Sequence, residues 1–230
     1  MTAAGFFTLP AVSIAMTVAT YALGLKLHLR WRWIPPILVA AAPIICLLVV
    51  LHEPFSAYNR GGAWITWLLG PGTVALAVPM FRNGIALRPS LPRLGVVVSL
   101  GSTVGMVSAG LTAWALGAPR AVVLSTLPKS VTTPIAIEVS KELGGIPAIT
   151  IAMVVITGVL GASFGVTILQ LLHIRGARAT GAAIGTASHG VGTASLVRRS
   201  EREAAVSSWA MAAAGIFISI VATILKFFLK

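Results

Sequence analysis

Residues 146–172 read IPAITIAMVVITGVLGASFGVTILQLL and contain no charged side chain. A run of this length can cross the hydrocarbon core of a bilayer, which is about 30 Å thick and needs roughly 20 helical residues. The whole chain has the same character. Of its 230 residues, 57% are hydrophobic and 10% are charged, whereas a soluble domain carries about 25% charged residues. The sequence therefore predicts an all-α polytopic membrane protein.

Eight apolar segments are separated by short polar connections. They run approximately over residues 5–25, 33–51, 62–81, 94–116, 121–139, 146–172, 180–196 and 205–228. Six of them are typical of plain membrane helices, and several carry glycines four residues apart, a spacing that lets helices approach closely in lipid. We expect about six spanning helices within a single transmembrane domain over residues 1–230.

The segments at 121–139 and 180–196 are interrupted by residues that do not suit a helix in contact with lipid. The first carries Pro128, Lys129 and Pro134 in its middle, and the second is rich in glycine and hydroxyl side chains. Irregular backbone at membrane depth is tolerated only where it is buried in protein or lines a cavity. We therefore expect both segments to be broken or re-entrant.

The charge balance is strongly basic, with 17 Lys and Arg, 5 acidic residues and a formal net charge of +12. The basic residues are spread through the connections and form no patch of the kind that binds nucleic acid. The positive-inside rule places residues 26–32, 82–93, 173–180 and 198–202 all in the cytoplasm only if both broken segments return to the side that they entered. Lys226 and Lys230 then remain outside. We expect a multi-pass protein of the cytoplasmic (inner) membrane.

Lys129 lies near the tip of the first broken segment. A charge at the membrane centre costs at least a few kcal/mol, and such residues usually mark functional sites. Pro134 favours a new helix with Thr133 as its N-cap, and the free N–H groups of that helix end would lie beside Lys129. Together these features predict an anion site. The structural alternative is a lysine that extends from a helix end to the interface.

His189 lies midway between Arg178 and Arg198 in the second broken segment. It can change its charge near neutral pH, so we expect it to carry or sense a proton that moves with the anion. The alternative is that His189 only packs. The candidate substrate-binding residues are Lys129, Ser130, Thr132, Thr133, Ser188, His189, Thr193 and Thr73.

Thr73 is included because of a faint internal repeat. Residues 70–76 read GPGTVAL and resemble residues 190–196, which read GVGTASL. Matching interruptions in two halves of a membrane protein are a sequence indication of a transporter site at the interface of two repeats. Short glycine-rich matches also arise by chance, so the repeat is left open.

Enzyme chemistry finds little support in the sequence. Residues 161–165, GASFG, match the G-x-S-x-G pattern of hydrolases, but that pattern belongs on a strand-to-helix turn and here lies within an apolar run. We interpret it as a small-residue packing face. A single cysteine, Cys46, excludes an intramolecular disulfide. We expect no catalytic residue, no cofactor and no metal.

Four stretches carry a resemblance to a known family. They are LPKSVTTPIA at 127–136, GGIP at 144–147, GTASHGVGTA at 185–194 and LGPGTVALAVP at 69–79. With these motifs the chain resembles the LrgB/CidB family over essentially its whole length, including YohK-like members and the C-terminal half of the plastidal glycolate/glycerate translocator. Gly72 departs from the pattern, where the family leads us to expect alanine.

The resemblance implies two competing functions. One is transport of small monocarboxylates such as glycolate, glycerate or pyruvate, and the other is an antiholin-like role that modulates murein hydrolase export and lysis. Both imply a smaller LrgA/CidA-type membrane protein as partner. The residues favour transport, because a holin-type pore needs neither a buried lysine nor a pair of broken helices. We expect a small carboxylate anion and the lipid bilayer as further partners, no nucleic acid, and leave self-association open.

Overall fold

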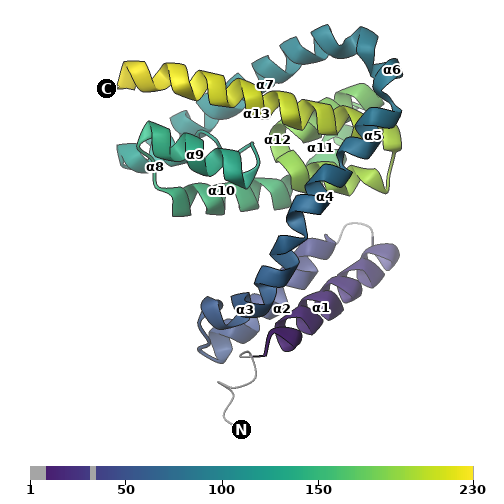
Figure 1. Ribbon diagram of the computed structural model, residues 1–230, viewed down its shortest axis with the longest axis vertical. Helices are drawn as coiled ribbons and strands as arrows, with labels where there is room; N and C mark the ends of the chain where they lie inside the picture. Colours follow the sequence, from purple (N-terminus) through teal and green to yellow (C-terminus); the bar gives the residue numbers. More distant parts are fainter. Residues whose placement is uncertain (1–8, 32–34, 230) are drawn as a thin grey trace. The chain divides into compact units, whose positions relative to one another are not determined.

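The computed structural model describes residues 9–31 and 35–229, and within these ranges the regular structure is entirely helical. The expected starts of the first two segments, residues 5–8 and 33–34, and Lys230 lie outside the described residues. The chain forms two compact units, Met1–Ala75 and Leu76–Lys230 (Figure 1), and each is described by itself. The expectation of a single domain over residues 1–230 stays a prediction.

The first unit contains α1 (Pro10–Arg30), α2 (Pro36–Val50), α3 (Phe55–Trp67) and α4 (Leu69–Ala75). Small residues let α1 approach its neighbours: Gly24 of α1 lies against the backbone of Pro36, and Gly61 of α3 lies against Pro10. The sequence placed residues 26–30 in a connection, but α1 continues to Arg30. His28 and Arg30 in the last turn suit the negative end of the helix dipole, which favours this extension.

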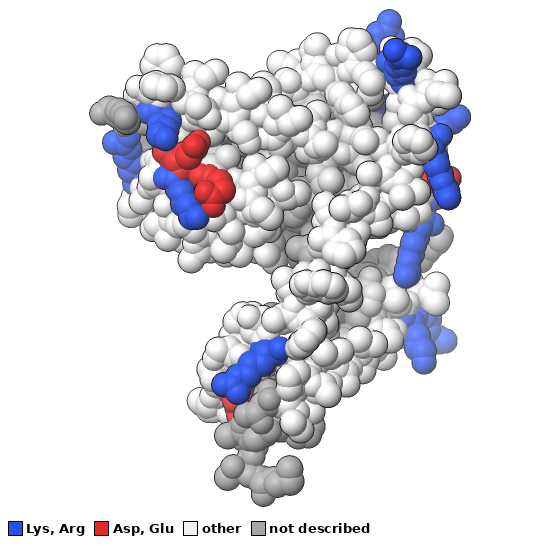
Figure 2. Space-filling view, in the orientation of Figure 1, with Lys and Arg blue, Asp and Glu red and all other residues white. Residues whose placement is uncertain are grey.

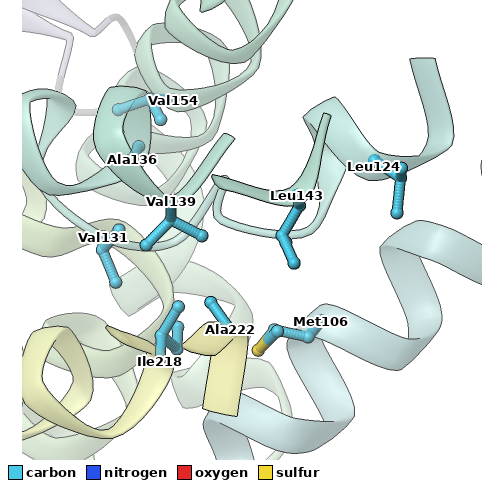
Figure 3. Close-up of a cluster of buried hydrophobic side chains, with 9 residues drawn as sticks. All are labelled: Met106, Leu124, Val131, Ala136, Val139, Leu143, Val154, Ile218 and Ala222. Carbon is cyan, nitrogen blue, oxygen red and sulfur yellow. The ribbon is translucent and has the colours of Figure 1, made fainter. Parts of the chain in front are cut away.

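The second unit holds the two segments that the sequence predicts to be broken. Its elements are α5 (Ala77–Arg82), α6 (Gly84–Leu87), the 3-10 turn η2 (Arg88–Ser90), α7 (Leu91–Ala115), α8 (Arg120–Thr126), α9 (Thr133–Leu143), α10 (Pro147–Leu160), the π-helical turn η3 (Gly161–Gly165), α11 (Val166–Leu171), α12 (Ala177–Val197) and α13 (Glu201–Leu229). The long helix α13 packs against α7, α9 and α12. One buried cluster joins α13 to Met106, Val131 and Val154 of the surrounding elements (Figure 3).

Among the described residues, five helices are long and apolar enough to cross a membrane, and a further apolar helix, α2, has 15 residues. The five are Pro10–Arg30, Phe55–Arg82, Gly84–Ala115, Pro147–Leu171 and Glu201–Phe228. The third of the predicted segments begins earlier than expected, at Phe55, and is interrupted at Leu68 and Leu76. The predicted all-α membrane architecture is confirmed, and both segments expected to be broken are interrupted, with five candidate spans where about six were expected.

Helix α12 is a hairpin. Its backbone leaves the helical region at His189, with φ 41° and ψ −139°. Gly192 then lies against the side chains of Ser188 and Ile184. Leu196 shares a buried cluster with Ile184, although residues twelve apart in a straight helix would be about 18 Å apart. The two halves of α12 therefore lie side by side, and the segment returns toward the side that it entered.

The segment containing α8 and α9 is broken between Leu127 and Thr132. Helix α9 ends at Gly144, which takes the left-handed φ of 81° that glycine adopts without strain. The next residue is also a glycine, Gly145. A larger residue would not fit there, because its Cβ would lie only 2.6 Å from the hydroxyl of Ser140. The amide of Ile146 then donates to the hydroxyl of Ser125 at 2.7 Å, which ties the start of α10 back to α8.

A buried hydroxyl network holds this hairpin on α10. The hydroxyl of Thr150 lies 2.7 Å from that of Ser140 and 3.0 Å from the backbone carbonyl of Ser125. All three residues are fully buried. The network therefore joins α8, α9 and α10 at one depth in the unit.

We expect Thr150→Val to lower the free energy of unfolding by about 1–3 kcal/mol, because it leaves buried polar groups unpaired. Thermal unfolding of purified protein in detergent measures the effect. Thr103→Val is the matched control, since the exposed Thr103 hydroxyl bonds only to its own helix at Ser99. Equal stability of the two variants would contradict the role of the network.

Charged side chains of the second unit gather at its ends. On the face shown in Figure 2, lysines and arginines lie at the end formed by α5 and α6 and again at the end formed by α8 and α9, and the surface between is largely uncharged. At the first end, Arg82 of α5 lies 3.8 Å from Glu201 of α13. This distribution is the one expected of a unit whose middle lies in lipid.

The hairpin arrangement predicts that residue 176 faces the cytoplasm and residue 142 faces outside. Gly176 is exposed, and a side chain there would meet no atom within 4 Å. In a Cys46→Ser background, a membrane-impermeant maleimide added to intact cells should label Glu142→Cys but not Gly176→Cys. Strong external labelling at position 176 would contradict the cytoplasmic placement of residues 173–180.

Candidate functional site

The tip of the first hairpin and a residue shortly before the tip of the second both contact the middle of α7. A Cβ on Gly101 would lie 3.4 Å from the methyl group of Thr186, and one on Gly105 would lie 3.7 Å from the hydroxyl of Ser130. Positions 101 and 105 are one helical turn apart, about 6 Å along the axis. The first hairpin tip and the residues just before the second tip are therefore neighbours within the second unit.

Lys129 lies in the break of the first hairpin and is half-buried. Its Nζ donates to the hydroxyl of Ser130 at 3.3 Å. Within the described ranges, no carboxylate forms an ion pair with it, and Glu138 of α9 bonds instead to Lys141 at 2.8 Å. An ammonium group has three donors, so Lys129 can hold a further acceptor.

Helix α9 begins beside Lys129, as the sequence predicts, but one residue earlier than expected. Thr132 is the N-cap, with φ −63° and ψ 146°, and Thr133 and Pro134 are the first two helical residues. The assignment of Thr133 as N-cap is wrong by one position, because Pro134 is accepted at the second helical position as well as the first. The Thr132 side chain makes no capping hydrogen bond, so the positive end of α9 remains available to an anion.

His189 forms the tip of the second hairpin and is only 5% exposed. Its Nε2 lies 3.1 Å from the backbone carbonyl of Val154 in α10. Because a carbonyl oxygen only accepts, Nε2 carries the hydrogen, and Nδ1 is the nitrogen left to accept a hydrogen bond or a proton. Gly158 makes room for the ring, since a Cβ there would lie 2.8 Å from Cε1 of His189.

The backbone at His189 is strained. A positive φ in a non-glycine residue costs roughly 1–3 kcal/mol and persists only where the surroundings enforce it. Thr193 helps to hold His189 in this conformation. Its hydroxyl donates to the carbonyl of His189 at 2.8 Å and accepts from the hydroxyl of Ser207 at 2.8 Å. The Thr193 hydroxyl thus holds the hairpin tip against α13.

The structure brings seven of the eight predicted residues into the two hairpins. Ser188 is buried against Gly161 of η3. Thr73 lies in α4 of the first unit, so its part in the site stays a prediction. The structure adds Thr186 and Ser102 to the neighbourhood of the tips. Ser102 gave no signal in the sequence because it is one of several hydroxyl residues spread along α7. Thr186 gave only a weak signal, its place in the glycine-rich segment.

Residues 161–165 form a packing surface, as the sequence predicts. Gly161 lies against Ser188, and Gly165 lies against Ile184, both on α12. Across the described part of the chain, no group of three or more His, Cys, Asp and Glu side chains is placed to hold a metal ion.

The LrgB-like family matches residues 17–227. The chain belongs to the LrgB-like family. The match covers both hairpins, and the family assignment and the apolar helices together establish a multi-pass membrane protein.

Three relatives illustrate the range of the LrgB-like family. The uncharacterized protein YxaC of Bacillus subtilis is 37% identical over 203 residues, or 87% of this chain and 88% of the relative. The antiholin-like protein LrgB of Bacillus mycoides is 32% identical over 92% of this chain and 94% of its own. The holin-like protein CidB of Staphylococcus aureus is 29% identical over 92% and 93%. No solved structure matches the chain.

Proposed function

We propose that this protein transports small monocarboxylates such as glycolate, glycerate or pyruvate, alone or as a subunit. The anion would bind between the broken segments 121–139 and 180–196. The observation that carries this proposal is Lys129, a half-buried cation beside Ser130 and the uncapped start of α9, with no ion-pair partner among the described residues. A single cation can neutralise a single carboxylate, so the site suits a monocarboxylate better than a dicarboxylate.

A second candidate is an antiholin-like role that modulates murein hydrolase export and lysis. It rests on the names of the relatives, which are called antiholin-like and holin-like. These names support the antiholin-like role better than they support transport, since neither name refers to a carboxylate. The geometry of the hairpins, with Lys129 beside the start of α9, favours transport.

In both cases a smaller LrgA/CidA-type membrane protein is the proposed partner. Uptake of radiolabelled glycolate into proteoliposomes, with the protein alone and with such a partner, separates the two functions. Saturable uptake above that of protein-free vesicles is expected. No uptake under either condition, together with altered murein hydrolase release when the protein is deleted, would favour the antiholin-like role.

A further inference from the structure

Ser102 carries a buried hydroxyl that the protein leaves unpaired. The residue is 1% exposed, and in the part of the chain that the structure describes its Oγ has no hydrogen-bond partner. An unpaired buried hydroxyl costs about 1–3 kcal/mol, so its presence in an otherwise apolar helix face needs an explanation.

Ser102 lies where α7, α13 and the first hairpin meet. It shares the buried face of α7 with Val98 and Met106. Val98 packs against Ala214 of α13, and Met106 belongs to the cluster that includes Val131 from the break of the first hairpin (Figure 3). Ser102 is therefore enclosed by the elements that surround the first hairpin tip.

Ser102 also belongs to the turn of α7 that touches both hairpins. It follows Gly101, which lies against Thr186, and precedes by three residues Gly105, which lies against Ser130. Residues three apart on a helix have their Cβ positions about 5–6 Å apart. Ser102 thus lies within one helical turn of the α7 position that contacts Ser130, which itself accepts from Lys129.

We propose that Ser102 is a specificity-determining residue that hydrogen-bonds the oxygen on the carbon next to the carboxylate of a small acid. This assignment rests on the proposed function. Lys129 and the start of α9 bind the carboxylate, and Ser102 distinguishes a 2-hydroxy or 2-oxo acid from the acid that lacks that oxygen. A hydroxyl can donate to a 2-oxo group and accept from a 2-hydroxyl group, so both kinds of acid fit.

The test compares glycolate with acetate, which lacks the second oxygen, in proteoliposomes that carry wild type, Ser102→Ala or Ser208→Ala. Ser208 is the matched control, because it is also a buried serine (4% exposed) with an unpaired Oγ, on α13. Ser208 is separated from the first hairpin. Gly215 is a position of α13 that contacts Ile135 of α9, and it lies seven residues, about 10 Å along the helix, from Ser208. Removing an unpaired hydroxyl breaks no hydrogen bond, so both variants should keep the wild-type unfolding temperature or exceed it.

The expected result is that Ser102→Ala lowers the preference for glycolate over acetate by about three- to tenfold, the loss of one neutral hydrogen bond, and that Ser208→Ala keeps the wild-type preference. Three outcomes would overturn the assignment: an unchanged preference in Ser102→Ala, an equal change in Ser208→Ala, or a clear loss of stability in Ser102→Ala, which would reveal a protein partner for the hydroxyl. Failure of the wild type to take up either acid would instead overturn the proposed function itself.

Discussion

Replacement of Lys129 by alanine is expected to reduce uptake of small carboxylates by about 100-fold, in line with the 1.5–3 kcal/mol of a hydrogen bond to a charged group. The protein should remain in the membrane at wild-type amounts, because the substitution removes a half-buried charge for which no ion pair is seen among the described residues. Initial uptake rates in proteoliposomes, normalised to reconstituted protein, measure the effect.

Two companion variants define what Lys129 does. Lys129→Arg should also impair uptake, because a planar guanidinium does not replace a compact ammonium in a tight site. Lys141→Ala is the matched control, since Lys141 is exposed and pairs with Glu138 at 2.8 Å, and it should transport normally. Unaltered uptake by Lys129→Ala would eliminate the proposed anion site.

Replacement of His189 by glutamine is expected to flatten the pH dependence of uptake. In the wild type, uptake should rise as the external pH falls below about 7, the range in which an ordinary histidine takes up a proton. Since Nε2–H is bound to the carbonyl of Val154, the additional proton would go to Nδ1. Glutamine keeps a polar side chain but cannot titrate, so some exchange activity should remain.

The competing role for His189 is that of a packing residue that holds the hairpin tip on α10. In that case His189→Gln would lower the rate at every pH and leave the shape of the pH profile unchanged. Uptake by the wild type that depends on sodium and is independent of pH would rule out proton coupling directly. Uptake measured from pH 5.5 to 8.5, with sodium and with potassium, separates these results.

The sequence predicted the two hairpins because their residues are unsuited to lipid. Pro128 and Pro134 cannot donate backbone hydrogen bonds within a helix, and the glycines around His189 signalled a close approach of backbones. The point of reversal in α12 was not predictable. It falls on His189 itself, with φ 41°, and a non-glycine residue in that conformation is held by contacts with α10 and α13 that no local pattern encodes.

The sequence identified those residues of the candidate site whose charge or local composition is unusual for a membrane helix, and it missed those that are common in such helices. Lys129 stood out because a cation at membrane depth is rare. Ser102 and Thr186 did not, because single hydroxyls in membrane helices commonly bond to their own backbone, as Thr103 does here. Only the packing of Gly101 and Gly105 against the two hairpins brings them into the site.

Substrate protection of a cysteine at position 132 tests most directly whether the anion binds where α9 begins beside Lys129. Thr132 is half-buried and is the N-cap of α9. The measurement is the rate at which a small maleimide labels Thr132→Cys in a Cys46→Ser background as glycolate is added. We expect glycolate to slow labelling saturably, and the same protein with Lys129→Ala to be labelled at one rate at all glycolate concentrations. Labelling that glycolate leaves unchanged, in protein that takes up glycolate, would contradict the location of the site.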